Sequence, residues 1–160
     1  MNSKKDEPFL SGIPMDVEPI HLEQFSEELP RQARLVSLDE ARDSLEQASS
    51  TMCILQSLSE EAHDLTDELE ILLEQLDIND EHVVQVAEQL ACLVAQWQGL
   101  VEELELTGAR IASLDLGRLE WYGIVDGTLA IYSWMIGEHD IEWYHDVHCS
   151  FQTRKPLIEA

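Results

Sequence analysis

Two long stripes of apolar residues, spaced to lie on one face of a helix, constrain this chain more than any other feature. The first stripe runs in steps of three and four over residues 41–76, and the second runs in the same way over residues 83–104. Only a short polar break at residues 77–80 separates them, which requires the two helices to fold back as an antiparallel hairpin. Either helix alone would expose its stripe to water. We therefore expect the stripes to pack on each other in the manner of a coiled coil.

The flanking residues indicate where these helices begin and end. Ser37 followed by Glu40 forms a capping box, which predicts the start of the first helix. Asn79 is expected to cap the second helix. The pair Thr107-Gly108 is expected to end it, because glycine readily adopts the backbone conformation found after a helix.

Charge excludes some classes of partner. The chain has a formal net charge of −24, and no Lys or Arg occurs between Arg42 and Arg110. Binding to nucleic acid or to anionic lipid depends on clustered basic residues, so we expect neither. The acidic surface is interpreted as a solubilising face, with adaptation to a salty cytoplasm and docking to a basic protein left open as alternatives.

The expected location is the cytoplasm. The three cysteines show no CxxC spacing, and no apolar leader develops near the N-terminus. No apolar run reaches the ~20 residues that a membrane-spanning helix requires.

Residues 1–34 contain four of the five prolines among scattered acids, and we expect a disordered, acidic N-terminal extension. Its apolar residues could alternatively form a short docking motif; they are Phe9, Leu10, Ile13, Met15, Ile20, Leu22 and Phe25. Residues 35–160 are expected to form a single domain.

The helical period stops after Gly108. Residues 111–122 are interpreted as a connector, and residues 128–136 and 141–147 as a β-hairpin rich in β-branched and aromatic residues. A turn of two or four residues would pair Ile136 with Ile141, Trp134 with Trp143 and Tyr132 with His145, and this face would lie on the helices. The predicted fold class is α+β and mainly α: a long antiparallel helical hairpin followed by a C-terminal β-hairpin.

The C-terminal segment also resembles a bacterial protein family, that of domain of unknown function 2203. The resemblance is carried by GIVDG at 123–127, SWMIGEHDIEWYH at 133–145, then Phe151, Arg154, Pro156 and Leu157, with VSLDEA at 36–41 as the start. It covers about residues 35–157 and implies no particular activity. It does imply that some residues matter more than others, namely Asp126, Gly137, Glu138, His145 and Arg154.

The chain departs from the family pattern at four positions. Ser133 stands where Cys is frequent and Tyr144 where Trp is frequent. His148 stands where an acid is usual, and Ser150 where glycine is usual. The last two departures put in doubt a carboxylate role at 148 and a glycine turn at 150.

Several side chains of the types that bind metals occur in this segment, namely His139, Asp140, His145, Asp146, His148 and Cys149. Their spacing is unfavourable, because seven residues of strand would separate Glu138 from His145 by roughly 20 Å. A site at His148 and Cys149, or one shared across a dimer, stays open, and no cofactor is identified. His145 is otherwise expected to pack on an apolar face and to donate a hydrogen bond to a carbonyl or to Asp126.

Arg154 is expected either to pair with Glu138 or to bind a carboxylate or phosphate. No nucleophile elbow, phosphate-binding loop or HExxH pattern occurs in the sequence. We therefore expect a non-enzymatic protein-interaction or structural module, acting on a protein partner or as a homodimer. The alternative is a small-ligand or metal-binding protein, or an enzyme, with its site at Asp126, Glu138, His145 and Arg154.

Overall fold

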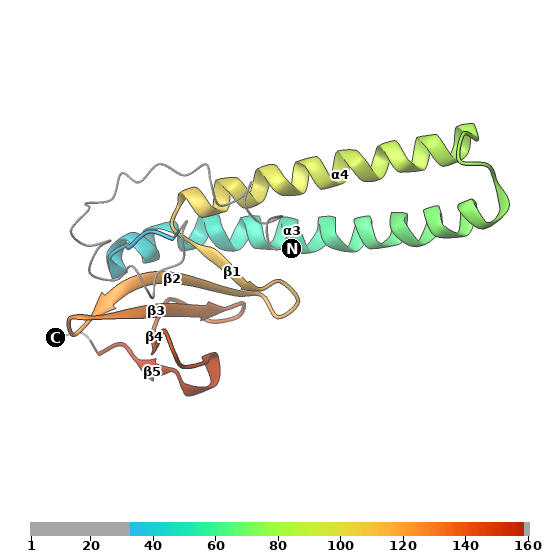
Figure 1. Cartoon of the computed structure of the whole chain (residues 1–160). Coiled ribbons are helices and arrows are strands. Elements are labelled where there is room, and N and C mark those ends of the chain that lie inside the picture. The colour runs from blue at the N-terminus through green and yellow to red at the C-terminus, as the bar shows by residue number, and fades with distance from the viewer. Residues whose placement is uncertain (1–32, 159–160) are drawn as a thin grey trace, which may run out of the picture.

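The computed structural model describes residues 33–158, which form two helices and a sheet. The helices lie side by side as an antiparallel hairpin, and the five strands form one antiparallel sheet in the order β1-β2-β3-β4-β5 (Figure 1). The elements are α3 (Leu38–Gln75), α4 (Glu81–Leu106), β1 (Arg110–Ser113), β2 (Arg118–Val125), β3 (Thr128–Met135), β4 (Trp143–Asp146), the short 3-10 helix η2 (Phe151–Thr153) and β5 (Lys155–Pro156). The predicted fold class is confirmed, although the C-terminal hairpin is part of a larger sheet. All but the last two residues of the predicted extension 1–34 lie outside the described residues.

Hydrogen bonds at the helix ends account for the helix boundaries. The capping box is present, since Ser37 Oγ accepts from Glu40 N and Glu40 Oε1 accepts from Ser37 N. The cap of α4 was predicted one residue too early: Asp80, rather than Asn79, accepts from the backbone N–H of His82. Gly108, with φ of 95°, follows the C-terminal end of α4, as predicted.

The two predicted stripes form the contact between the helices. Every stripe residue is buried or half-buried except Leu76, which lies just beyond the end of α3. A hairpin of two helices covers each stripe from one side only, so many of these side chains keep some exposure. Burial is deepest near the sheet, where Met52, Leu55 and Leu104 are almost completely enclosed.

The predicted connector is in fact the first half of the sheet. Residues 111–122 provide most of β1 and the first part of β2, which continues to Val125 and pairs with β3 along its whole length. A tight turn joins β2 to β3 through Asp126 and Gly127, both of which have positive φ. Residues 33–36 lie beside β2 on the same side as β1, and Val36 N donates to Tyr122 O there.

The register predicted for β3 and β4 was wrong by one residue. Tyr132 pairs with Tyr144 and Ser133 with Trp143, whereas His145 lies opposite Ile131. The connection between the strands has seven residues, 136–142, rather than two or four. An odd number of loop residues shifts the pairing by one, and this shift moves the side chains of one strand to the other face. Trp134 therefore packs toward the helices as expected, while Trp143 and His145 lie on the opposite face.

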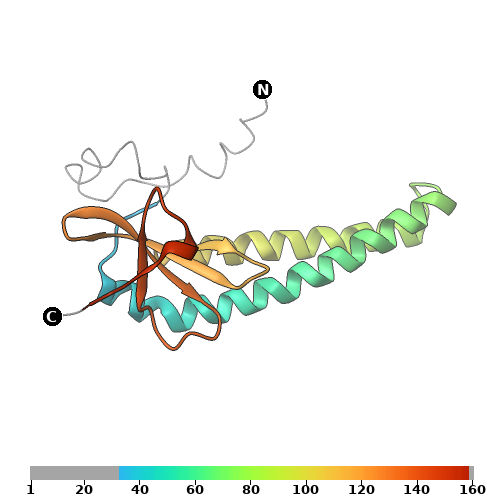
Figure 2. The same ribbon diagram turned by 90° about the horizontal axis from the view of Figure 1, so that it is seen from below.

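The inner face of the sheet packs on the helices near the start of α3. Its main core residues are Leu119, Trp121, Tyr132 and Trp134, which meet Ala41, Ala48 and Met52 of α3 and Leu104 of α4. Specific hydrogen bonds fix this arrangement: Trp121 Nε1 donates to Ser44 Oγ, and Gln56 Nε2 donates to the Leu114 carbonyl. The rest of the hairpin projects beyond the sheet (Figure 2). Neither α3 nor α4 is long and apolar enough to cross a membrane.

Candidate functional site

The clearest interaction among the predicted site residues joins Arg154 to Glu138. The Arg154 guanidinium donates to both carboxylate oxygens, with Nη2 at 2.8 Å from Oε2 and Nη1 at 3.2 Å from Oε1. Both side chains are largely buried, with exposed fractions of 14% and 20%. Glu138 Oε1 also accepts from the backbone N–H of Met135. The carboxylate is therefore held by three donors, and the pair connects the loop after β3 to the segment before β5.

Aromatic side chains surround this ion pair. The guanidinium carbon of Arg154 lies 3.8 Å from the ring centroid of Phe151 and 5.3 Å from that of Trp143. A second guanidinium, that of Arg118, also lies 3.8 Å from the Phe151 centroid. Two arginines on one ring make Phe151 the centre of a cationic and aromatic cluster.

Arg118 differs from Arg154 in having no acidic partner among residues 33–158. Its Nε is buried and has no hydrogen-bond partner in the structure. A buried donor without an acceptor is costly, of the order of 1–3 kcal/mol. Arg118 Nε is therefore a buried donor that the described residues leave without an acceptor.

His145 also lies on the outer face of the sheet, which is the face that points away from the helices. Residues level with one another across the strands form a row: Ser133 and Trp143 belong to one row, and His145 belongs to the next. Only 6% of it is exposed, and its Nδ1 lies 2.9 Å from the carbonyl oxygen of Asp146. Neighbouring rows on one face are about 7 Å apart along the strands. His145 therefore lies one row away from Ser133, which Arg154 Nη1 approaches at 3.5 Å. The expected hydrogen bond from His145 to a backbone carbonyl is thus present.

Glu120 belongs to this outer face, although it was not singled out in the sequence. It lies on β2 opposite Ser133 on one side and Arg110 on the other. Burial raises the pKa of its carboxyl, and electrostatic interactions with His145 and Arg110 lower that pKa in part. Burial also raises the pKa of Tyr122, and the nearby Glu120 raises it further. Glu120 is therefore a largely enclosed carboxyl on the outer face, close enough to Tyr122 to affect its pKa.

Asp126 lies apart from the other three predicted site residues. It is exposed in the β2–β3 turn. Tyr122 of β2 is level with His145 across the sheet, and Asp126 lies four residues further along the chain than Tyr122. Four residues of strand correspond to about 13 Å. The structure therefore brings Glu138 and Arg154 into contact, places His145 one row away, and leaves Asp126 at the far end of the hairpin.

Metal ligands do not converge on any point of the described chain. Within residues 33–158, no three side chains among His, Cys, Asp and Glu lie close enough to hold a metal ion. The outer face instead gathers three arginines, two glutamates and one histidine, which we call the outer-face cluster: Arg110, Arg118, Glu120, Glu138, His145 and Arg154. This composition suits the binding of an anion better than that of a metal.

The comparison with protein families agrees with the resemblance seen in the sequence. The model of the family described as "Uncharacterized conserved protein (DUF2203)" matches residues 34–157, which is most of the chain. The chain belongs to this family. No curated protein and no solved structure matches it.

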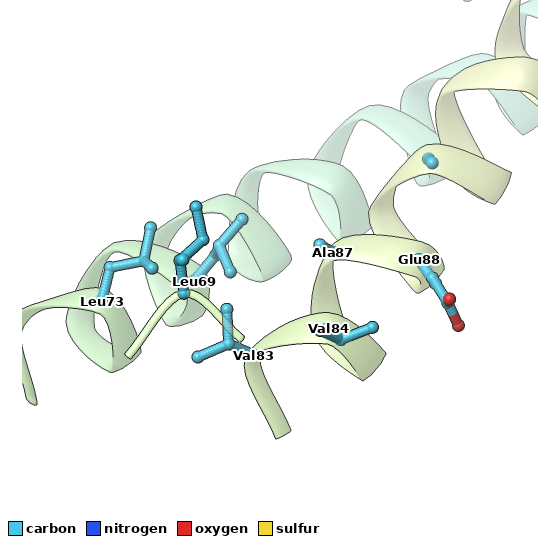
Figure 3. A pocket seen from close by; sticks show the side chains of 8 residues that line it. Leu69, Leu73, Val83, Val84, Ala87 and Glu88 are labelled. Atoms are coloured by element: carbon cyan, nitrogen blue, oxygen red, sulfur yellow. The ribbon is translucent and has the colours of Figure 1, made fainter. Parts of the chain in front are cut away.

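The DUF2203 match also spans a second feature, an open apolar groove of about 340 Å³ at the tip of the helical hairpin. Figure 3 shows Leu69 and Leu73 of α3 on one side and Val83 and Ala87 of α4 on the other, with Glu88 extending at the edge. Leu69 and Val83 belong to the predicted apolar stripes, whereas Leu73 and Ala87 lie outside them. The groove exists because no third element of the described part of the chain covers the helices at this end.

Proposed function

We propose that this DUF2203 protein is a non-catalytic interaction module that presents the distal part of its helical hairpin to a protein partner. We define the distal hairpin as residues 58–100. The sheet and the first part of α3 form the base that holds the hairpin, and the distal hairpin extends from this base as a two-helix arm.

The observation that carries this proposal is the position of the contacts between α3 and the sheet. The hydrogen bonds and core contacts that join them in the described chain involve α3 residues no further along than Gln56. Among residues 33–158, the helices beyond that point contact mainly each other, and they extend past the sheet (Figure 2). Extended arms with exposed apolar side chains are typical of interaction surfaces.

The exposed side chains of the arm support the same interpretation. Several large apolar residues of the distal hairpin are substantially exposed, among them Ile71, Leu73, Ile78, Val84 and Val94. Single exposed apolar residues are common on any protein, but four of these five lie toward one end of one arm. A partner that covers this end would remove apolar surface from water, which stabilises association.

Site-specific photo-crosslinking in the cells that produce the protein tests this proposal. A photoreactive amino acid would replace Ser59 or Gln89 in the distal hairpin, and Gln47 or Thr128 near the sheet as matched exposed positions. We expect covalent adducts of defined mass at the two distal positions only. Adducts confined to the positions near the sheet, or no adducts, would contradict the proposal. An adduct of twice the mass of the chain would identify the partner as a second copy.

A second candidate function rests on Arg118. Its buried Nε without an acceptor, next to Phe151 and Arg154, supports a site for a small carboxylate or phosphate ligand on the outer-face cluster. The ligand would lie beside Glu138. His145 is level with Tyr122, four residues of strand or about 13 Å from Arg118, and Asp126 is farther still, so neither is expected to take part. Thermal unfolding with inorganic phosphate, citrate or zinc added separately tests this idea. A rise in melting temperature with an anion that disappears in Arg118→Gln supports it, and the absence of any shift overturns it.

A further inference from the structure

The groove at the tip of the hairpin has the dimensions of a binding site for a short helix. Its α4 side runs from Val83 to Ala91, a distance of about 12 Å at 1.5 Å per residue. A helical peptide spans nearly the same length, about 10.5 Å, between residues i and i+7. Two or three apolar anchors at i, i+3 or i+4, and i+7 therefore fit the groove, and its volume of about 340 Å³ is at the lower end for ligand sites.

Carboxylates surround this groove. The segment from residue 60 to residue 88, which forms the tip, contains eleven acids and no Lys or Arg. They are Glu60, Glu61, Asp64, Asp67, Glu68, Glu70, Glu74, Asp77, Asp80, Glu81 and Glu88. Two of them lie beside histidines, His63 with Asp67 and His82 with Glu68, and both pairs are exposed. The groove is thus an apolar strip within a strongly negative surface.

We infer that the tip groove binds a basic amphipathic helix of another protein. This inference rests on the proposed function and specifies the chemistry of the partner. Leucine-sized side chains of the helix enter the groove between α3 and α4, and Lys or Arg residues beside them pair with the carboxylates of the tip. The apolar contacts supply most of the affinity, and the charges supply selectivity and rapid association.

Charge disfavours a second copy of this chain as the occupant. Two tips in contact would bring twenty-two carboxylates together without a Lys or Arg from either tip. Like charges placed against each other across an interface cost several kcal/mol. A basic partner removes this repulsion, whereas a second tip doubles it.

Titration of the full-length protein with three synthetic peptides tests the inference. The first is an 18-residue amphipathic helix with leucines on one face and lysines on the other; the second carries glutamate in place of lysine; the third carries serine in place of leucine. We expect binding of the first peptide, with a dissociation constant that rises as salt is added, because salt screens the charges. We expect binding at least ~10-fold weaker for the other two, because the second peptide lacks the positive charges and the third lacks the apolar side chains. Equal binding of the lysine and glutamate peptides overturns the inference, as does equal binding of the peptide without leucines.

Paired variants locate the site on the protein. The double variant Leu73→Ser with Val84→Ser changes groove residues that are 45% and 40% exposed. Its control, Ile54→Ser with Ile124→Ser, changes apolar residues outside the distal hairpin that are 46% and 39% exposed. We expect the first variant to weaken binding of the lysine peptide by ~10-fold or more and the control to leave it unchanged, with circular dichroism verifying that both are folded. Equal effects of the two variants overturn the inference.

Charge variants distinguish an effect of the carboxylates at the tip from an effect of the protein's overall negative charge. Glu81→Gln with Glu88→Gln removes two carboxylates at the tip, and Glu102→Gln with Glu103→Gln removes two exposed carboxylates near the other end of α4. A larger loss of affinity in the first variant supports the inference, and equal losses assign the binding to net charge and overturn it.

Two other occupants of the groove, a second copy of the chain and the chain's own N-terminal segment, would be recognised by different results. Concentration-dependent dimerisation in sedimentation equilibrium that Leu73→Ser with Val84→Ser abolishes would assign the groove to a second copy. A large gain in peptide affinity in Phe9→Ser with Ile13→Ser would assign it to the N-terminal segment of the same chain. Either outcome overturns the inference. Photo-crosslinks at Ser59 and Gln89 would persist if only the chemistry of the partner were wrong, so failure of the inference is distinguishable from failure of the proposed function.

Discussion

Arg154 donates two parallel hydrogen bonds to Glu138, and this pair joins the loop after β3 to the last strand of the sheet. Glu138 uses one of the same oxygens to accept from Met135 N, and its own carbonyl accepts from Trp134 Nε1. One loop residue therefore organises the end of β3, the indole of a core tryptophan and the approach to β5. The loop has a defined shape because its polar groups are satisfied by specific partners.

Arg154→Ala is expected to destabilise the fold by about 1–3 kcal/mol. The substitution leaves the largely buried Glu138 carboxylate with one donor, the backbone N–H of Met135, and an unpaired buried charge is more costly than the pair is favourable. Chemical denaturation measures the free energy of unfolding. Lys155→Ala is the matched control, because Lys155 Nζ lies 4.0 Å from Asp146 and both side chains are about half exposed. Such exposed pairs contribute less than about 1 kcal/mol. Equal losses in the two variants would show that the Glu138 pair has no special structural role.

The sequence predicted the helices well because helix periodicity and capping are local signals. The stripe from residue 41 to residue 76, the capping box at Ser37 and the end at Gly108 all depend on residues close together in the chain. The error at Asn79 is a choice between two adjacent residues that can both cap a helix.

The sheet was predicted only in part, because strand pairing depends on contacts between distant residues. Gly117 and Gly123 were interpreted as breaks in a connector, but Gly117 lies in the β1–β2 turn and Gly123 lies inside β2. The one-residue error between β3 and β4 has a similar cause. The seven-residue loop is fixed by the side chain of Glu138, and no turn rule based on sequence alone includes that contact.

Prediction of the candidate site was limited in the same way. The pairing of Arg154 with Glu138 was among the expectations, and the structure shows it. Glu120, Arg110 and Arg118 were not, because they belong to the strands interpreted as a connector. The tip groove was missed because apolar spacing does not reveal which side of a helix lacks a neighbour.

Glu120→Gln is expected to change the pH dependence of stability. Burial raises the pKa of Glu120 in the folded protein above its ordinary value of 4.5. The folded state then binds the proton more tightly than the unfolded chain does. The stability contributed by the protonated carboxyl is fully present below pH 4.5 and is lost as the pH rises through the raised folded pKa.

The measurement is the free energy of unfolding of Glu120→Gln and of the unmodified protein at a series of pH values above 4.5. Glutamine cannot ionise, so we expect the stability of the variant to increase relative to that of the unmodified protein as the pH rises. Glu142→Gln, at an exposed position next to β4, serves as the control and should show no such trend. A difference between the two proteins that stays constant with pH would contradict the assignment of a raised pKa to Glu120.

Added salt is expected to stabilise the protein against heat. The helical hairpin from Asp43 to Ala109 contains no Lys or Arg, so repulsion among its carboxylates opposes folding. The Debye length falls from about 30 Å at 0.01 M salt to about 8 Å at 0.15 M, which screens most of this repulsion. The melting temperature should therefore rise across this range by a similar amount in sodium chloride and potassium chloride. A melting temperature that is independent of salt, or that responds to only one cation, would show that general screening is not the cause.

Gly123→Ala and Gly99→Ala are expected to have opposite effects on stability. A Cβ at Gly123 would lie within 2.7 Å of three atoms of the buried Tyr132 side chain, one of them at 2.5 Å. Such overpacking of a core costs about 1–3 kcal/mol. A Cβ at Gly99 meets nothing within 4 Å, and alanine in a helix is more stable than glycine by about 0.5–1 kcal/mol. Urea denaturation of both variants tests this difference, since each exchange adds one methyl group. If Gly123→Ala were as stable as the unmodified protein, the Tyr132 ring would have room to move, and the close approach of β2 to that ring would not explain the glycine at position 123.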